Sequence, residues 1–123
     1  MKIAIAEDDP RFAKQLEAYI EQFATENQFQ VEILRFPDGA SLVEAYDCTF
    51  DLLLLDVDMP GLDGISAARQ IRERDTDVLL MFITNLAQYA IKGYEVDALD
   101  YVLKPVNYAA LSMKLKKVLR VWR

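Results

Sequence analysis

In FDLLLLDVDMPGLDG, residues 50 to 64, four consecutive leucines run directly into a group of aspartates. Leu52 to Leu55 have no polar partner face, which is typical of a central parallel strand covered by helices on both sides. Asp56 and Asp58 follow at the end of this buried strand. Carboxylates in that position suggest phosphate and metal chemistry, and several reactions are compatible with them.

Strands and helices alternate along the rest of the chain. Apolar and β-branched runs predict four further strands, at Lys2–Ala6, Gln30–Phe36, Val78–Thr84 and Tyr101–Leu103. Apolar spacings of three and four predict five helices. The first helix begins near Pro10 and carries the apolar stripe Phe12, Leu16, Tyr19, Ile20 and Phe23, and the second follows Pro37–Gly39 and carries Leu42, Val43 and Tyr46. The third follows Gly64, with Arg69, Arg72, Glu73 and Arg74 largely outward, and the fourth covers Gln88–Tyr94. The fifth covers Asn107–Trp122, with Leu111, Leu115, Val118, Leu119 and Trp122 on one face.

This alternation predicts the architecture. Five strand–helix units without an internal repeat predict one α/β domain over residues 1–123, with a doubly wound parallel sheet, right-handed crossovers and helices on both faces. The composition, 53% hydrophobic and 28% charged, is that of a packed domain.

The composition also excludes several kinds of site. The sequence contains no histidine, which excludes Ser-His-Asp and Cys-His nucleophiles and histidine-ligated zinc. The net charge of -6 gives the domain no electrostatic footprint for nucleic acid, so any DNA binding would need another part of a longer protein. Cys48 is the single cysteine and cannot form an intrachain disulfide. With no signal peptide and no apolar stretch long enough to cross a bilayer, we expect a cytoplasmic location and no membrane partner.

Polar residues follow the ends of four predicted strands. In doubly wound sheets the ligand site lies at the carboxyl ends of the strands, near the point where strand order reverses. The residues at those ends are Glu7, Asp8 and Asp9, then Asp56 and Asp58, then Thr84, then Lys104. The sequence therefore predicts that acids, a hydroxyl and an ammonium group meet at one edge.

The charges at this edge need a cation. Two carboxylates ~4 Å apart repel by about 4 kcal/mol at an effective dielectric constant of 20, so Asp8 and Asp56 require Lys104 or a divalent metal beside them. Oxygen ligands without histidine or thiolate favour a hard metal, Mg²⁺. Phosphoryl transfer to a carboxylate is the chemistry that fits these groups.

The whole chain resembles the receiver domain of two-component response regulators. The likeness consists of the acidic pair Glu7-Asp8, the apolar strand leading into DVDMPGLDG, Thr84 at the end of the fourth strand, and DYVLKP at Asp100–Pro105. The resemblance implies a flavodoxin-like (βα)5 fold with strand order 2-1-3-4-5. It also implies a signalling domain that is not an enzyme beyond its own phosphorylation and dephosphorylation.

The resemblance also assigns roles at the predicted edge. Asp56 would accept a phosphoryl group from a sensor histidine kinase. Asp8 and Asp56 would bind Mg²⁺ directly, Glu7 would act through metal-bound water, and Asp58 would contribute its backbone carbonyl. From the residues alone, the Asp58 side chain and Asp9 remain alternative metal contacts, and Asp9 is otherwise the solvent-facing start of a helix.

A switch is implied as well. Lys104 would pair with Asp56 and the phosphoryl oxygens, after a cis Lys104–Pro105 bond. The hydroxyl of Thr84 would bind the phosphoryl group, and Tyr101 would move inward and alter the surface of the fourth helix, fifth strand and fifth helix. Without the family, Tyr101 would be interpreted as a half-buried core aromatic.

The output of the domain is less specified. Tyr94–Val106 is similar to receivers that carry a LytTR-type DNA-binding domain, which would lie beyond Arg123. The basic residues of the last helix are compatible with a solvated face or with a homodimer surface. A stand-alone phosphorelay receiver, a haloacid-dehalogenase-like phosphatase with LLLLDVDMP as its DxD motif, and a degenerate binding module are the alternatives.

Overall fold

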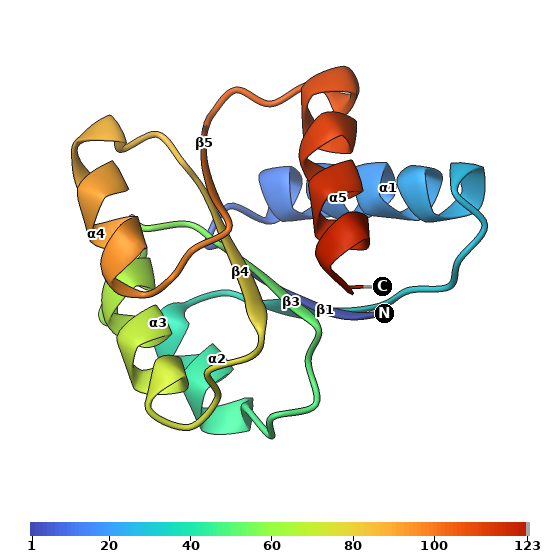
Figure 1. Ribbon diagram of the computed structural model, residues 1–123. Coiled ribbons are helices and arrows are strands. Elements are labelled where there is room, and N and C mark those ends of the chain that lie inside the picture. Colours follow the sequence, from blue (N-terminus) through green and yellow to red (C-terminus); the bar gives the residue numbers. More distant parts are fainter. Residues whose placement is uncertain (123) are drawn as a thin grey trace.

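A five-stranded parallel sheet lies between two helical layers in the computed structural model, which describes residues 1–122 (Figure 1). The order of the strands is β2-β1-β3-β4-β5, with every neighbouring pair parallel, as predicted. The strands are β1 (Lys2–Ala6), β2 (Glu32–Phe36), β3 (Leu52–Leu55), β4 (Leu79–Thr84) and β5 (Asp100–Leu103). The strand order reverses beside β1, between the carboxyl ends of β1 and β3.

Figure 1 shows helices α1 and α5 on one face of the sheet and α2, α3 and α4 on the other. The helices are α1 (Pro10–Glu26), α2 (Gly39–Ala45), α3 (Gly64–Arg72), α4 (Ala90–Glu95) and α5 (Tyr108–Trp122). Successive leucines of β3 point to opposite faces, so Leu53 and Leu55 join the core under α2 to α4, while Leu52 and Leu54 join the core under α1 and α5. Both cores need apolar residues from the same strand, which explains the unbroken leucine run.

Aspartate side chains fix the starts of three helices. Asp9 accepts a hydrogen bond from the backbone N–H of Arg11 and precedes Pro10, the first residue of α1. Asp38 and Asp63 cap α2 and α3 in the same way. Asp9 is therefore a helix cap, as one of its two interpretations held.

The region of α4 differs from the predicted single helix over Gln88–Tyr94. It begins as a 3-10 turn, η1 (Ala87–Tyr89), and continues as the six-residue α4, which ends at Glu95. Neither start carries a side-chain cap. Short helices without caps depend on tertiary contacts for their stability.

The outward position predicted for Arg72 is wrong. Its guanidinium group donates hydrogen bonds of 2.7 Å to the backbone carbonyls of both Val78 and Val96, and so ties α3 to β4 and to the end of α4. Arg69, Glu73 and Arg74 are exposed as predicted. Helical periodicity places the Cα of Arg72 at the rim of the apolar face, but a long side chain reaches from there to buried carbonyls.

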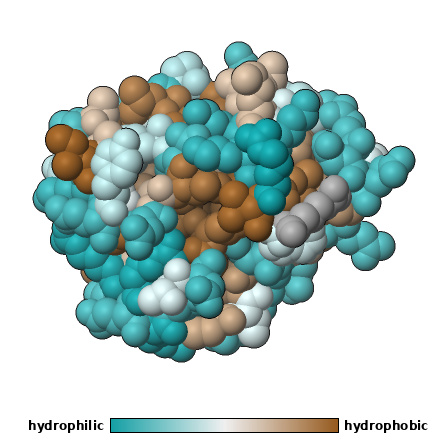
Figure 2. Space-filling model, in the orientation of Figure 1, coloured by the Kyte–Doolittle hydropathy of each residue, from teal (hydrophilic) through white to brown (hydrophobic). Residues whose placement is uncertain are grey.

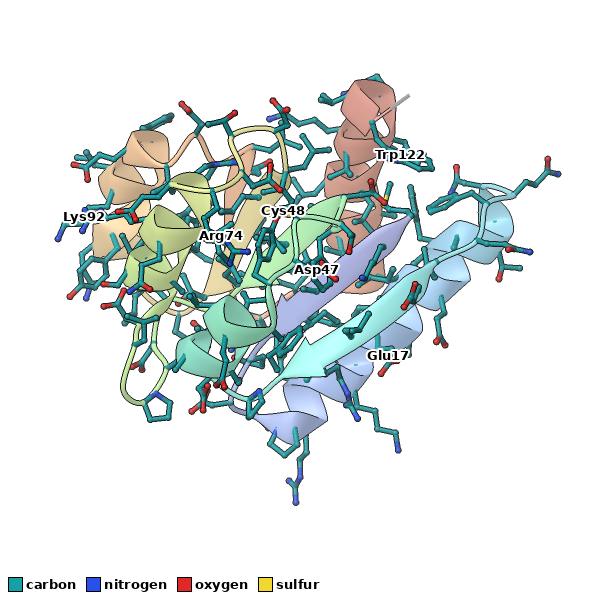
Figure 3. All side chains as sticks on the ribbon, turned by 90° about the horizontal axis from the view of Figure 1, so that it is seen from below. Glu17, Asp47, Cys48, Arg74, Lys92 and Trp122 are labelled. Atoms are coloured by element: carbon teal, nitrogen blue, oxygen red, sulfur yellow. The ribbon has the colours of Figure 1, made fainter. Side chains whose placement is uncertain are left out.

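The edge opposite the strand ends holds the loop before β3. In Figure 3, Asp47, Cys48 and Arg74 lie together at this edge, and the guanidinium group of Arg74 donates a hydrogen bond of 2.9 Å to the carbonyl of Tyr46. Cys48 is exposed and distant in the fold from the residues that follow the strands. Trp122 packs on Phe29 with ring centroids 6.2 Å apart but stays 38% exposed, so it is less buried than the predicted face of α5 implies. No helix within residues 1–122 combines the length and apolar character needed to cross a membrane.

Candidate functional site

The predicted polar residues meet at the carboxyl edge of the sheet. Glu7 and Asp8 follow β1, Asp56 follows β3, Thr84 ends β4 and Lys104 follows β5. Carboxylate oxygens of Glu7, Asp8 and Asp56 all lie within 4.8 Å of one another. Glu7 and Asp56 are buried and Asp8 is exposed, so the acidic cluster reaches solvent at Asp8.

Lys104 is the cation of this cluster. Its Nζ donates a hydrogen bond of 3.0 Å to Oδ2 of Asp56 and a second, short hydrogen bond to Oε1 of Glu7. The side chain of Lys104 is only 12% exposed. Burial acts to lower the pKa of Lys104, but the two carboxylates outweigh burial and raise it. The contact with Asp56 is the predicted one, the contact with Glu7 is additional, and the predicted cis Lys104–Pro105 bond is confirmed.

The loop after β3 holds Asp56 from its backbone side. The N–H of Asp58 donates to Oδ1 of Asp56 at 3.1 Å, whereas the exposed side chain of Asp58 does not belong to the carboxylate cluster. A Cβ at Gly64 would lie 2.0 Å from the carbonyl oxygen of Asp56. Only glycine permits this approach, so the start of α3 packs directly against the backbone of the central aspartate.

The two buried carboxyl groups have opposite pKa shifts. Burial, followed by the hydrogen bond to Asp56, raises the pKa of Glu7 to about 8. Burial also acts to raise the pKa of Asp56, but hydrogen bonds outweigh it and hold that pKa below its usual range. The groups that lower the pKa of Asp56 are Glu7, Thr84, Lys104 and the backbone of Asp58. At neutral pH the cluster therefore holds Asp56 ionised and Glu7 largely protonated when no other cation is bound.

The donor set fits a magnesium ion. When Glu7 is ionised, its buried Oε2 has no hydrogen-bond partner among residues 1–122, which is a costly state for a carboxylate oxygen. Hard divalent cations take oxygen ligands and keep several waters, and the exposed Asp8 leaves room for them. The candidate ligands are the carboxylates of Asp8 and Asp56, the backbone carbonyl of Asp58 and, through water, Glu7.

Leu86 connects Thr84 to Tyr101. Thr84 is fully buried, and its Oγ1 accepts a hydrogen bond of 3.3 Å from the N–H of Leu86. The hydroxyl of Tyr101 donates to the carbonyl oxygen of the same residue. The ring of Tyr101 is half-buried and packs on Phe82, with centroids 5.7 Å apart. Thr84 and Tyr101 therefore bind the backbone of the same residue, Thr84 at the N–H of Leu86 and Tyr101 at its carbonyl oxygen.

Sequence reasoning missed one member of the site, Phe12, and the backbone contacts of another, Leu86. Leu86 acts through backbone atoms, for which its side chain gives no signal. Phe12 was predicted as part of the core stripe of α1, but its ring lies 4.2 Å from Nζ of Lys104. A residue three positions into a helix that starts at the ligand edge could have been recognised as a neighbour of the site.

Comparison with known proteins gives the family. A model of the response regulator receiver domain matches residues 3–116. Curated relatives include the transcriptional regulatory protein ResD of Bacillus subtilis, 31% identical over 97% of this chain and 48% of that protein, and the sensory transduction protein LytT of the same organism, 41% identical over 59% of this chain and 30% of that protein. The match thus covers about half the length of ResD and less than a third of the length of LytT.

Solved structures of receiver domains have the same fold as this chain. The response regulatory domain of mrkE from Klebsiella pneumoniae superposes with a TM-score of 0.86 at 28% identity, over 99% of this chain and 98% of that one. The receiver domain of a sensor histidine kinase from Pseudomonas aeruginosa, solved with a magnesium ion coordinated in its active site cleft, has a TM-score of 0.75 at 25% identity, over 98% of this chain and 95% of that one. The chain therefore belongs to the receiver domain family of two-component response regulators.

Proposed function

We propose that Asp56 is the phosphoacceptor of this receiver domain and takes a phosphoryl group from the phosphohistidine of a sensor kinase in a magnesium-dependent reaction. The observation that carries the proposal is the state of Asp56. It is buried at the end of the central strand, paired with Lys104, and its pKa is held below the usual range. A fixed, ionised carboxylate is a ready nucleophile.

The surrounding residues support the transfer. A carboxylate oxygen of Asp56 attacks phosphorus, the O–P bond forms as the P–N bond to the kinase histidine breaks, and the histidine leaves with the bonding electron pair. Magnesium bound at the acidic cluster supplies positive charge beside the phosphoryl oxygens, as it does in other phosphoryl transfers. Lys104 stays next to Asp56 and offers its N–H groups to the incoming oxygens, while Asp58 keeps Asp56 oriented through its N–H.

The phosphorylated form would signal through the Leu86 connection. A hydrogen bond from the hydroxyl of Thr84 to the phosphoryl group withdraws Oγ1 from the N–H of Leu86, and the carbonyl of Leu86 holds Tyr101. The change reaches α4, β5 and α5 from there. Such small shifts are amplified when the element that moves has two packed arrangements.

The α4–β5–α5 face has the properties of an output surface. Ile91 and Tyr94 of α4 are 77% and 80% exposed. Figure 2 shows apolar side chains gathered in a hollow between α4 and α5, where a cavity of about 390 Å³ is lined by Tyr94, Leu99, Tyr101 and Lys117, among others. We propose this face as the homodimer surface of the activated domain.

The proposed output is transcription through a LytTR-type DNA-binding domain on the same polypeptide. The likeness to LytT and the Tyr94–Val106 segment support this output, and the net charge of -6 assigns DNA contacts to another domain. A stand-alone phosphorelay receiver is the second candidate. The acidic pair after β1, in a sheet ordered β2-β1-β3-β4-β5, favours both over a haloacid-dehalogenase-like phosphatase. A cytoplasmic location, which a single unpaired cysteine favours, belongs to the proposal as well.

Intact mass after incubation with a small acyl phosphate tests the phosphoacceptor. The expected result is one added phosphoryl group with magnesium and none with a chelator, and none in Asp56→Asn. Asp77→Asn, an exposed aspartate before β4 at the opposite edge of the sheet, is the matched control and should be phosphorylated like the parent. An adduct that persists in Asp56→Asn, or never forms in the parent, would rule the proposal out.

Amide hydrogen exchange tests the signal path. A beryllium fluoride complex, which mimics an aspartyl phosphate, should change exchange in residues 84–103 in the parent. Tyr101→Phe, which lacks the donor to Leu86, should show a weaker change there. Unchanged exchange in this region of the parent would contradict the proposed route.

A further inference from the structure

Phe12 lies against the one side of the Lys104 ammonium group that the carboxylates leave open. The Nζ of Lys104 is 4.2 Å from the centroid of the Phe12 ring, within the range of a cation–π contact. An ammonium group has three N–H donors. Two of them bind Glu7 and Asp56, so one N–H is left that neither carboxylate takes.

The start of α1 explains why a phenylalanine stands there. Asp9 caps the helix and Pro10 is its first residue, so Phe12 belongs to the first turn. Side chains of a helix tilt toward its N-terminus. A large side chain in this turn therefore reaches back to the carboxyl edge of the sheet, where β1 ends and Lys104 arrives from β5. The half-buried ring also packs on the core under α1 and α5.

Lys104 has a long, flexible side chain, and the structure offers two carboxylate partners for it. A lysine with two acceptors and open water on its third side can adopt several positions between them. An aromatic face excludes water from that side and attracts the charge without accepting a directed hydrogen bond. Phe12 thus restrains Nζ while its donors stay free to turn from Glu7 toward a phosphoryl oxygen.

We propose that Phe12 is a positioning residue for Lys104, holding its ammonium group beside Asp56 through the face of the ring. The kinetic consequence rests on the proposed phosphoacceptor function, whereas the placement of Lys104 does not. An aliphatic residue of similar volume would fill the same space but would lack the π face. A comparison of aliphatic and aromatic residues at position 12 therefore separates the effect of the π face from that of packing.

Two variants make this separation. Phe12→Leu keeps an apolar side chain, and Phe12→Tyr keeps the aromatic face. With a small acyl phosphate and saturating magnesium, which removes any effect of kinase docking, Phe12→Leu should be phosphorylated about three- to tenfold more slowly than the parent. Phe12→Tyr should restore the parent rate. Tyr19→Leu is the matched control on the same helix, since Tyr19 packs on Tyr108 away from the cluster, and its rate should equal that of the parent.

Proton–carbon NMR of lysine labelled at Cε gives a readout that packing alone would not move. The Cε protons of Lys104, assigned by the signal that Lys104→Arg loses, should be shifted upfield by the ring current in the parent and in Phe12→Tyr, without magnesium or phosphodonor. In Phe12→Leu this shift should be lost. Retention of the shift in Phe12→Leu, or its loss with an unchanged phosphorylation rate, would overturn the proposal. A parent chain that is never phosphorylated would refute the proposed function instead, and the NMR comparison would still decide whether the Phe12 ring lies against Lys104.

Discussion

Replacing Glu7 with glutamine should make the metal-free protein more stable at neutral pH. Glu7 is 5% exposed, and its pKa rises from an ordinary value of 4.5 to about 8 in the folded protein. Because the folded state binds the proton more tightly than the unfolded chain, this contribution to stability is fully present below pH 4.5 and is lost as the pH rises to 8. At 1.36 kcal/mol per pH unit the loss is about 3 kcal/mol at pH 7 and about 5 kcal/mol above pH 8.

Glutamine has the shape of the protonated acid. Its carbonyl oxygen can accept from Lys104 as Oε1 of Glu7 does, and its amide can donate toward Asp56. The free energy of unfolding of the Glu7→Gln variant should therefore exceed that of the parent by only about 1 kcal/mol at pH 5 and by about 3 kcal/mol at pH 7. The window from pH 5 to 8 lies above the titration of Asp56, whose pKa is lowered, and below that of Lys104, whose pKa is raised.

Urea unfolding in a chelating buffer at pH 5, 6, 7 and 8 measures the effect. Cation binding to the folded state adds to stability. Magnesium should therefore raise the free energy of unfolding of the parent at pH 7 and 8, and it should raise that of Glu7→Gln less. Glu44→Gln, at an exposed glutamate of α2, is the control and should follow the parent at every pH. A parent whose free energy of unfolding does not fall between pH 5 and 8, or a Glu7→Gln variant whose free energy of unfolding falls equally, would contradict the raised pKa of Glu7.

Three further substitutions test other parts of the structure. Arg72→Met leaves two backbone carbonyls without their donor and should lower the free energy of unfolding by about 2–4 kcal/mol in urea titrations. Gly64→Ala places a Cβ against the carbonyl of Asp56, so it should cost about 1–3 kcal/mol and slow acyl phosphate labelling measured by intact mass. Tyr46→Phe removes a hydrogen bond of 2.5 Å to Asp75. Burial acts to raise the pKa of Asp75, but the hydrogen bonds that this carboxylate accepts outweigh burial and lower it. The substitution should destabilise the protein by about 1–2 kcal/mol at pH 7, and the difference should disappear in acid as Asp75 protonates.

The fold was predictable from the sequence because the strongest signals lie in the sheet. The leucines of β3 are apolar on both sides, and polar residues follow four strands at their carboxyl ends. Parallel strands bring those ends to one edge whatever the details of the loops. The contact of Lys104 with Asp56 could therefore be predicted across nearly fifty residues of sequence.

The contacts that the sequence did not predict depend on how far side chains reach and on backbone atoms. Arg72 was assigned to solvent because periodicity describes where a Cα lies, but its guanidinium group ends at buried carbonyls. The hydrogen bond from Lys104 to Glu7 was missed because both acids of the pair Glu7-Asp8 had been assigned to the metal. The contacts of Leu86 with Thr84 and Tyr101 involve only its backbone groups, which every residue has, so its side chain could not reveal them.

Site-localised mass spectrometry of the phosphorylated chain identifies the residue that carries the phosphoryl group. After brief incubation with a small acyl phosphate and magnesium, we expect a single phosphoryl group on the peptide containing Asp56. Hydroxylamine, which cleaves acyl phosphates, should remove this group. A phosphoryl group on any other residue, or a hydroxylamine-resistant linkage on that peptide, would exclude Asp56 as the phosphoacceptor.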